Sequence, residues 1–175
     1  MNKNETLEIV RFNEVSEQEY NDYIIEWEST NELIVPSATN RKGRSFLEMM
    51  NKWILDETDD AYKNGFVPST LYYMINDNRK IIGAIHFRQQ LNDRLIQNGG
   101  NVGYGIRPSE RRKGYATIML YKLLKMLKNQ KNEKVLITCD EDNIASAITI
   151  EKANGKLQDK VSFQGVMTRR YWIYL

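Results

Sequence analysis

Cysteine and histidine, the residues that most often build disulfides and transition-metal sites, are almost missing from this chain. Its 175 residues include one cysteine, Cys139, and one histidine, His86. A lone cysteine excludes an intrachain disulfide, and one cysteine with one histidine falls short of the ligand set of a structural zinc site. We therefore expect no bound metal, and the cysteine usage fits a reducing compartment.

Long apolar runs and an excess of one charge are missing as well. No apolar run reaches the about 20 residues that a membrane helix needs, and the N-terminal stretch MNKNETLEIVRF lacks the apolar core of a signal peptide. The chain carries 25 basic and 23 acidic residues, a formal net charge of +2. A general nucleic-acid binder needs a strong basic excess. We expect a cytoplasmic protein without a membrane or nucleic-acid partner.

What the sequence does contain is typical of one globular domain. Hydrophobic residues make up 41% and charged residues 27% of the chain, as in soluble proteins of ordinary composition. A length of 175 residues is enough to bury a proper core. We expect a single domain over residues 1–175, with a core over about residues 7–174.

Apolar periodicity and turn residues predict the order of the elements. Ser16, followed three residues later by Glu19, is a capping-box pattern that starts the first helix. Residues 91–100 are expected as a polar connector. The step from 101 to 139 is by default a right-handed parallel crossover, and the other strands are expected to be antiparallel. The predicted order is strand 7–12, helices 16–30 and 45–65, strands 69–77, 80–90 and 101–108, helix 114–130, strand 133–140, helix 143–155, and strands 157–163 and 167–174.

The stretch RPSERRKGYATIML, residues 107–120, places three cations at the start of a helix. The helix dipole makes cations unfavourable there, so the pattern indicates an anionic ligand. A glycine loop between a strand and a helix directs free backbone N–H groups at one spot, where phosphate binds. Gly114 allows close approach, and Arg111, Arg112 and Lys113 add charge for a diphosphate. A basic triplet alone is also typical of a solvated loop.

Two nucleotide-binding motifs are excluded by the glycine spacing. A P-loop needs glycine, four residues and then Gly-Lys-Ser/Thr, which the chain lacks. A dinucleotide fingerprint needs three glycines, whereas GYGIRP has Gly103 and Gly105 and then Pro108 in the third place. The phosphate ligand therefore belongs to another fold.

The tract from 111 to 116, RRKGYA, resembles the Q/R-x-x-G-x-G/A signature of the GNAT family of N-acetyltransferases. Ile106 and Pro108 match the hydrophobic-x-Pro that precedes this signature, and the element order agrees over nearly the whole chain. The longer tract GGNVGYGIRPSERRKGYA resembles a bacterial subgroup of these enzymes. About thirty residues on, a second family motif, N-x-x-A/S ending in E-K-x-G, is matched by Asn143, Ser146, Glu151, Lys152 and Gly155.

The resemblance implies an α/β architecture of the α+β mixed-sheet kind, the GNAT fold, with about six to seven strands and about four flanking helices. It also implies that acetyl-coenzyme A places its pyrophosphate on the amides of residues 111–116 and its pantetheine arm along strand 101–107. A splay between that strand and strand 134–139 would admit the arm. The implied cofactor-binding residues are Ile106, Arg111, Arg112, Lys113, Gly114, Tyr115, Ala116, Thr117, Asn143 and Ser146. Asn143 is equally well explained as a helix N-cap.

The function that the resemblance implies is direct transfer of the acetyl group to a primary amine of a small molecule or peptide, in a ternary complex. Such transfer needs a neutral amine, a donor for the oxyanion and a proton for the leaving thiolate. No covalent enzyme intermediate is needed, so Cys139, in an apolar strand, is expected to be a core residue. A homodimer is an expected assembly.

The chain departs from the family at both acid–base positions. Ile150 stands where many relatives have a tyrosine, and Gly100 and Asn101 stand where some have a glutamate. Tyr104 and His86 are the candidate catalytic residues, although a strand tyrosine is often a core residue and a strand histidine often structural. Water-relayed proton loss, or carboxylates at 140 and 141, stay open. These departures also allow an alternative function, a weakly active or inactive acyl-coenzyme A sensor or assembly subunit.

The acceptor is expected to enter from the side formed by the first two helices and the connector 89–100. Trp27, Trp53 and Tyr62 are candidates for shaping a pocket there, and their helical spacing fits a core face equally well. An acidic cluster ends the second predicted helix and would favour a cationic amine if it faced the cleft, although a solvated helix end explains it too. The cluster consists of Asp56, Glu57, Asp59 and Asp60.

Overall fold

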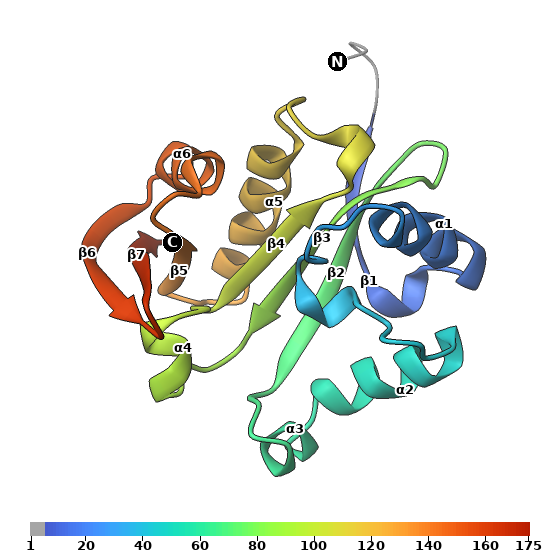
Figure 1. Ribbon diagram of the computed structural model, residues 1–175, viewed down its shortest axis with the longest axis horizontal. Helices are drawn as coiled ribbons and strands as arrows, with labels where there is room; N and C mark the ends of the chain where they lie inside the picture. The colour runs from blue at the N-terminus through green and yellow to red at the C-terminus, as the bar shows by residue number, and fades with distance from the viewer. Residues whose placement is uncertain (1–5) are drawn as a thin grey trace.

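The computed structural model describes residues 6–175. The predicted domain and the N-terminal stretch MNKNETLEIVRF both begin in residues 1–5, which lie outside the described residues. Seven strands and six α-helices follow one another along the described chain (Figure 1). The elements are β1 (Leu7–Arg11), α1 (Glu17–Glu28), α2 (Phe46–Asp56), α3 (Asp60–Lys63), β2 (Ser69–Asn76), β3 (Ile81–Arg88), α4 (Asp93–Gln97), β4 (Val102–Ile106), α5 (Tyr115–Asn129), β5 (Lys134–Asp140), α6 (Ile144–Lys152), β6 (Lys156–Phe163) and β7 (Val166–Tyr174).

The strands form two sheets rather than one continuous ladder. The first sheet has the order β1-β2-β3-β4 and the second the order β5-β7-β6, and all pairs within them are antiparallel. The predicted step from 101 to 139 therefore links the two sheets through α5. β4 and β5 are facing edge strands, so each keeps one row of backbone groups that no neighbouring strand pairs.

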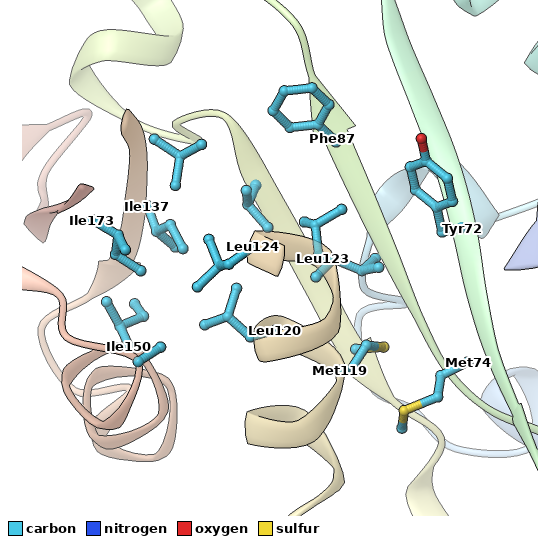
Figure 2. Packing of buried hydrophobic residues seen from close by; sticks show 14 of the residues in the cluster. Tyr72, Met74, Phe87, Met119, Leu120, Leu123, Leu124, Ile137, Ile150 and Ile173 are labelled. Carbon is cyan, nitrogen blue, oxygen red and sulfur yellow. The ribbon is translucent and has the colours of Figure 1, made fainter. Parts of the chain in front are cut away.

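Two hydrophobic clusters cover the two faces of the first sheet. Side chains alternate along each strand, so in β2 Tyr72 and Met74 face α5, whereas Leu71 and Tyr73 face α1 and α2. Figure 2 shows the α5 cluster continuing to α6 and the second sheet, so that one core joins both sheets. This shared core fixes the position of β4 relative to β5.

The long helices begin where the capping patterns predict. Ser16 Oγ accepts from the Glu19 amide at 3.3 Å while Glu19 Oε2 accepts from the Ser16 amide at 2.7 Å, so the predicted capping box is confirmed. The same arrangement at Ser45 and Glu48 starts α2. The prediction of about four helices corresponds to α1, α2, α5 and α6.

Two short helices correct the prediction. The predicted helix 45–65 breaks after α2, because Thr58 Oγ1 donates back to the Leu55 carbonyl at 2.9 Å and accepts from the Asp60 amide at 3.2 Å. Such local bonds compete with a continuous helix. The predicted connector 91–100 contains α4, which Asn92 caps by accepting from the Leu95 amide at 2.9 Å.

No helix in residues 6–175 combines the length and the apolar character needed to span a bilayer. Over the same part of the chain, no group of three or more His, Cys, Asp or Glu side chains is placed to hold a metal ion.

Candidate active site

β4 and β5 form a fork that is closed at one end by Asn101. The Asn101 amide donates to the Leu136 carbonyl at 2.7 Å, and its side-chain oxygen accepts from the Leu136 amide at 2.8 Å. Its side-chain NH₂ donates to the Arg88 carbonyl at 3.0 Å. One buried side chain thus ties β3, β4 and β5 together, and beyond it β4 and β5 belong to separate sheets.

Gly100 and Asn101, the residues at the expected glutamate position, therefore serve the backbone of the fork. A Cβ atom on Gly100 would lie 2.4 Å from the Leu136 carbonyl oxygen, and the residue has a φ of +56°, so glycine is required there. This role of Asn101 cannot be predicted from a local motif, because the partner Leu136 lies 35 residues away in the chain. An asparagine in strand context was the only available signal.

Tyr104 spans the fork from β4 to α6. Its hydroxyl lies 2.9 Å from Ser146 Oγ and 3.4 Å from the Ser146 carbonyl oxygen. Ser146 is in turn held by Asn143, whose side chain accepts from the Ser146 amide at 3.1 Å and caps α6. The structure brings these three predicted site residues together, with Asn143 in the cap position that was its alternative interpretation.

Burial favours the neutral forms of the titratable groups around the fork. Burial raises the pKa of Tyr104 to about 12, so the hydroxyl keeps its proton at neutral pH and can donate it. Burial also raises the pKa of the Cys139 thiol, against a smaller opposing effect of Ser146. A thiol that resists ionisation is a poor nucleophile. The surroundings of the fork thus keep the Tyr104 hydroxyl protonated and disfavour covalent catalysis by Cys139.

His86, the other catalytic candidate, lies on the opposite face of the sheet from Tyr104. In the β3–β4 register Tyr104 is opposite Ile85, and His86 is opposite Gly103, so the two side chains point away from each other. Burial first, and then the charges of Arg88 and Lys52, hold the pKa of His86 well below its usual range. The imidazole is neutral at physiological pH and too weak a base to take a proton from an ammonium group efficiently.

The loop before α5 presents a row of backbone N–H groups. Gly114 is the N-cap of α5 with a φ of +82°, and nothing lies within 4 Å of the position of an added Cβ. No acceptor in residues 6–175 takes the amides of Arg112, Lys113, Gly114, Ala116 or Thr117. Unpaired amides at an open helix N-terminus suit an anion. We call residues 111–117 the cradle.

The cations of the cradle are less available than the sequence indicates. Arg111 donates to the Ile106 carbonyl at 3.2 Å, pairs with Glu32 at 2.7 Å and stacks over the Trp27 ring at 4.9 Å. Lys113 pairs with Glu110 at 2.7 Å. Arg112 alone among the three has no partner in the described part of the chain.

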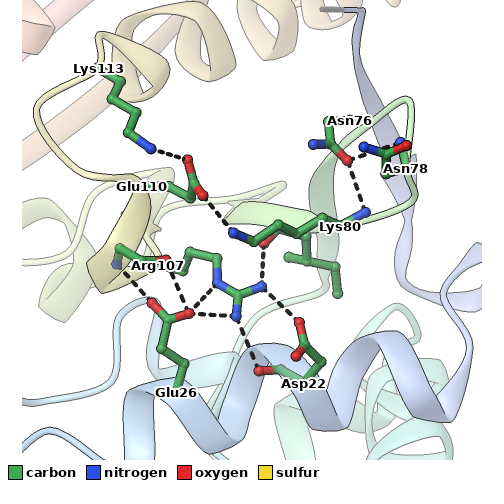
Figure 3. A network of polar contacts seen from close by, with 10 residues as sticks. Asp22, Glu26, Asn76, Asn78, Lys80, Arg107, Glu110 and Lys113 are labelled. Carbon is green, nitrogen blue, oxygen red and sulfur yellow. Dashed lines mark hydrogen bonds and ion pairs between the residues drawn. The ribbon is translucent and has the colours of Figure 1, made fainter.

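A polar network that no sequence motif indicates holds the cradle in place (Figure 3). The buried Arg107 guanidinium donates to Glu26 at 2.7 Å and to Asp22 at 3.0 Å, both on α1. Glu26 also accepts from the Ser109 amide at 2.7 Å. Glu110 lies between Lys113 and Lys80, 2.6 Å from the latter. These contacts fix the β4–α5 loop to α1 and to the β2–β3 turn.

Ile150, which stands at the family's tyrosine position, is a core residue. Its side chain is fully buried and lies beside Ile173 and Ile137, in the core between α6 and the second sheet (Figure 2). Ile150 therefore contributes packing between α6 and β7.

The residues proposed to shape an acceptor pocket fall into two groups. Trp27 and Trp53 are buried in the α1–α2 cluster, so their alternative interpretation as core residues holds. Tyr62 is 46% exposed, and its hydroxyl donates to Gln90 at 2.9 Å, at the start of the connector. In the acidic cluster, three of the four carboxylates are engaged in ion pairs: Asp56 with Lys52, Glu57 with Arg11, and Asp60 with Lys63.

The family of acetyltransferase (GNAT) domains matches residues 10–156 of the chain. No curated protein sequence shows a significant match. Solved structures with similar folds include a ribosomal-protein alanine acetyltransferase from Vibrio fischeri, with a TM-score of 0.64, 13% identity, and coverage of 99% of this chain and 94% of that one. A chimera of the Vibrio cholerae spermidine N-acetyltransferase SpeG and hSSAT has a TM-score of 0.64 and 13% identity, covering 96% and 95%. The ribosomal α-N-protein acetyltransferase RimL in complex with coenzyme A has a TM-score of 0.65 and 15% identity, covering 97% and 94%.

Proposed function

Because the chain belongs to the GNAT acetyltransferase family, we propose that it transfers the acetyl group of acetyl-coenzyme A directly to a primary amine of a small molecule or peptide. Two features of residues 6–175 carry the proposal: an open fork between two strand edges that no strand there pairs, and the amides of Arg112, Lys113, Gly114, Ala116 and Thr117, which have no acceptor there. A long ligand with a diphosphate at one end matches both features. Neighbouring folds that act on spermidine and on ribosomal proteins support an amine acceptor.

The residues of the chain fit this co-substrate. The cradle amides would take the pyrophosphate, with Arg112, which has no partner in residues 6–175, beside them, and the open space at Gly114 leaves room for close approach. Ile106 and the exposed edge of β4 would flank the pantetheine arm, with Asn143 and Ser146 on the α6 side of the fork. Acetyl-coenzyme A supplies the thioester whose acetyl group is transferred.

The fork residues then have distinct tasks. Tyr104 holds a proton on its hydroxyl at the fork and is placed to deliver it to a leaving thiolate. Cys139 stays a thiol and takes no part as a nucleophile. Burial holds the pKa of His86 well below its usual range, so the imidazole is too weak a base and the acceptor amine loses its proton to water.

A thiol-release assay with acetyl-coenzyme A and a panel of primary amines tests the proposal. We expect acceptor-dependent release of coenzyme A, together with formation of the N-acetyl product by mass spectrometry. Calorimetric titration with acetyl-coenzyme A measures cofactor binding separately. Absence of cofactor binding would overturn the whole proposal.

A second function is favoured by the positions of Ile150 and Asn101. Ile150 is in the core, and the Asn101 side chain is already bonded to the backbone of β5 and β3. Neither residue can therefore supply the acid or base that other family members have at these positions. The alternative is therefore an acyl-coenzyme A sensor or assembly subunit with weak or no catalysis. Tight calorimetric binding without turnover on any amine would favour it. A cytoplasmic location and a homodimer stay predictions.

A further inference from the structure

Arg88 stands at the closed end of the fork, at the C-terminus of β3. It lies two residues beyond His86 on the face that α1 and α2 cover. Its Nη1 donates to the carbonyl oxygens of Gly99 at 2.8 Å and Gly100 at 3.2 Å. Its Nη2 lies 3.3 Å from where a Cβ atom of Gly103 would be. The guanidinium thus lies against β4 at Gly103, near the closed end of the fork.

This guanidinium has no counter-ion. Among residues 6–175, no carboxylate lies within ion-pairing distance of Arg88, whereas Lys52, which acts on the neighbouring His86, is paired with Asp56. Burial, assisted by Arg94, lowers the pKa of Arg88 to about 10, so the group is still a cation at neutral pH. Keeping a charge without a counter-ion in a half-buried place is unfavourable, which indicates an anionic ligand.

The surroundings of Arg88 also suit the chemistry of an amine acceptor. The cations Arg88 and Arg94 act on this face together with Lys52, whose charge Asp56 partly offsets, and His86 itself is neutral. A positive environment disfavours the ammonium form of an incoming amine and favours the neutral form that attacks. It would at the same time attract an acidic group carried by the same molecule.

We propose that Arg88 binds a carboxylate of the acceptor, so that the acceptor is a primary amine that also carries a carboxylate, in the simplest case an amino acid. The inference rests on the proposed acetyl transfer and names its substrate class. A guanidinium and a carboxylate pair through two parallel hydrogen bonds, which fix orientation as well as position. Anchoring the carboxylate beside Gly103 holds the amine of the same molecule near the fork.

The test compares amino acids with their C-terminal amides as acceptors in the thiol-release assay, for the wild type, Arg88→Gln and Arg94→Gln. In the wild type we expect kcat/KM to be roughly 10- to 100-fold higher for the acids, as for a hydrogen bond to a charged group. Arg88→Gln should abolish this preference. Arg94→Gln, which removes an exposed cation nearby, should keep it, and acetyl-coenzyme A affinity should be the same in all three proteins.

Two outcomes would overturn the proposal while leaving acetyl transfer intact. One is that the wild type acetylates amides or spermidine as well as, or better than, amino acids. The other is that the preference for amino acids over amides survives in Arg88→Gln. Were Arg88 only a brace for the Gly99 and Gly100 carbonyls, Arg88→Gln would lower the melting temperature without changing the acid-to-amide ratio.

A binding measurement keeps the proposal testable if Arg88→Gln fails to fold or if no amine is acetylated. His86 is the single histidine of the chain, so tag-free protein with labelled histidine gives one imidazole signal beside Arg88. Adding an amino acid to the wild type with coenzyme A bound should shift that signal, and the matching amide should not. Equal shifts, or none, would refute the carboxylate site.

Discussion

The cradle and the face around Arg88 both concentrate positive charge, but they make it available to a ligand in opposite ways. In the cradle, Arg111 and Lys113 are already paired with Glu32 and Glu110, and the free groups are backbone amides. Around Arg88, a side-chain cation has no carboxylate of residues 6–175 within ion-pairing distance. The density of basic residues in a sequence therefore says little about where charge is free. We expect cofactor affinity to depend on the backbone, and acceptor choice and turnover to depend on side chains.

The largest effect is expected at Tyr104, the side chain that crosses the fork. Tyr104→Phe removes the oxygen and keeps the ring. If the hydroxyl protonates the leaving thiolate, kcat should fall by about 10²–10⁴-fold, with little change in acetyl-coenzyme A affinity. Because its pKa is raised to about 12, the donor stays protonated as the pH rises through 10, the ordinary tyrosine value. Loss of rate between pH 8 and 10 should therefore not come from this group.

Ser146→Ala is the matched control, because it removes the hydroxyl partner of Tyr104 and leaves the Tyr104 side chain and the Ser146 carbonyl in place. We expect a smaller fall in kcat than for Tyr104→Phe, together with unchanged circular dichroism. A Tyr104→Phe enzyme with full rate at every pH would exclude the acid role and leave water as the proton source.

The next largest effect is on stability, at Ile150. Ile150→Ala truncates a fully buried side chain and should lower the free energy of unfolding by about 2–5 kcal/mol. The rate per folded molecule should persist, because the side chain faces the core rather than the fork. Ile148, on the same helix and 47% exposed, provides the control: Ile148→Ala should change stability by less than about 1 kcal/mol. Denaturant unfolding and kcat, measured on both variants, separate packing from chemistry.

A smaller effect is expected on cofactor affinity at Gly114. Gly114→Ala places a methyl group in the open space of the cradle and should weaken acetyl-coenzyme A binding roughly tenfold, about the net value of one hydrogen bond. Gly165→Ala is a control for backbone strain, because Gly165 has the same φ of +82° and equally open surroundings. Both variants should lose similar stability, and calorimetry should show weaker binding for Gly114→Ala alone. Equal affinities would move the pyrophosphate away from the cradle.

The features that the sequence predicts are those that short segments encode. The cradle lies within one loop and one helix turn, and the Ser16 capping box within four residues, so both are visible without the fold. The direction of the Tyr104 side chain, toward α6, required the β3–β4 register, because a shift of one residue reverses the face of every side chain. That Arg88 has no carboxylate partner in residues 6–175 could not be predicted, because only the fold shows where the carboxylates lie. The short helices α3 and α4 depend on single side-chain bonds at Thr58 and Asn92 that periodicity does not detect.

The smallest effects distinguish the cations within the cradle. Arg112→Ala removes the one member of the triplet without a partner in residues 6–175, and should weaken acetyl-coenzyme A binding up to about fivefold, as for an exposed ion pair of up to ~1 kcal/mol. Lys113→Ala should change the affinity by less than about twofold, because Lys113 is held by Glu110, which keeps Lys80 as a partner. The loss in Arg112→Ala should shrink as salt screens the charge. Calorimetry at two ionic strengths measures both variants, and an equal loss in each would mean that Lys113 leaves Glu110 for the phosphates.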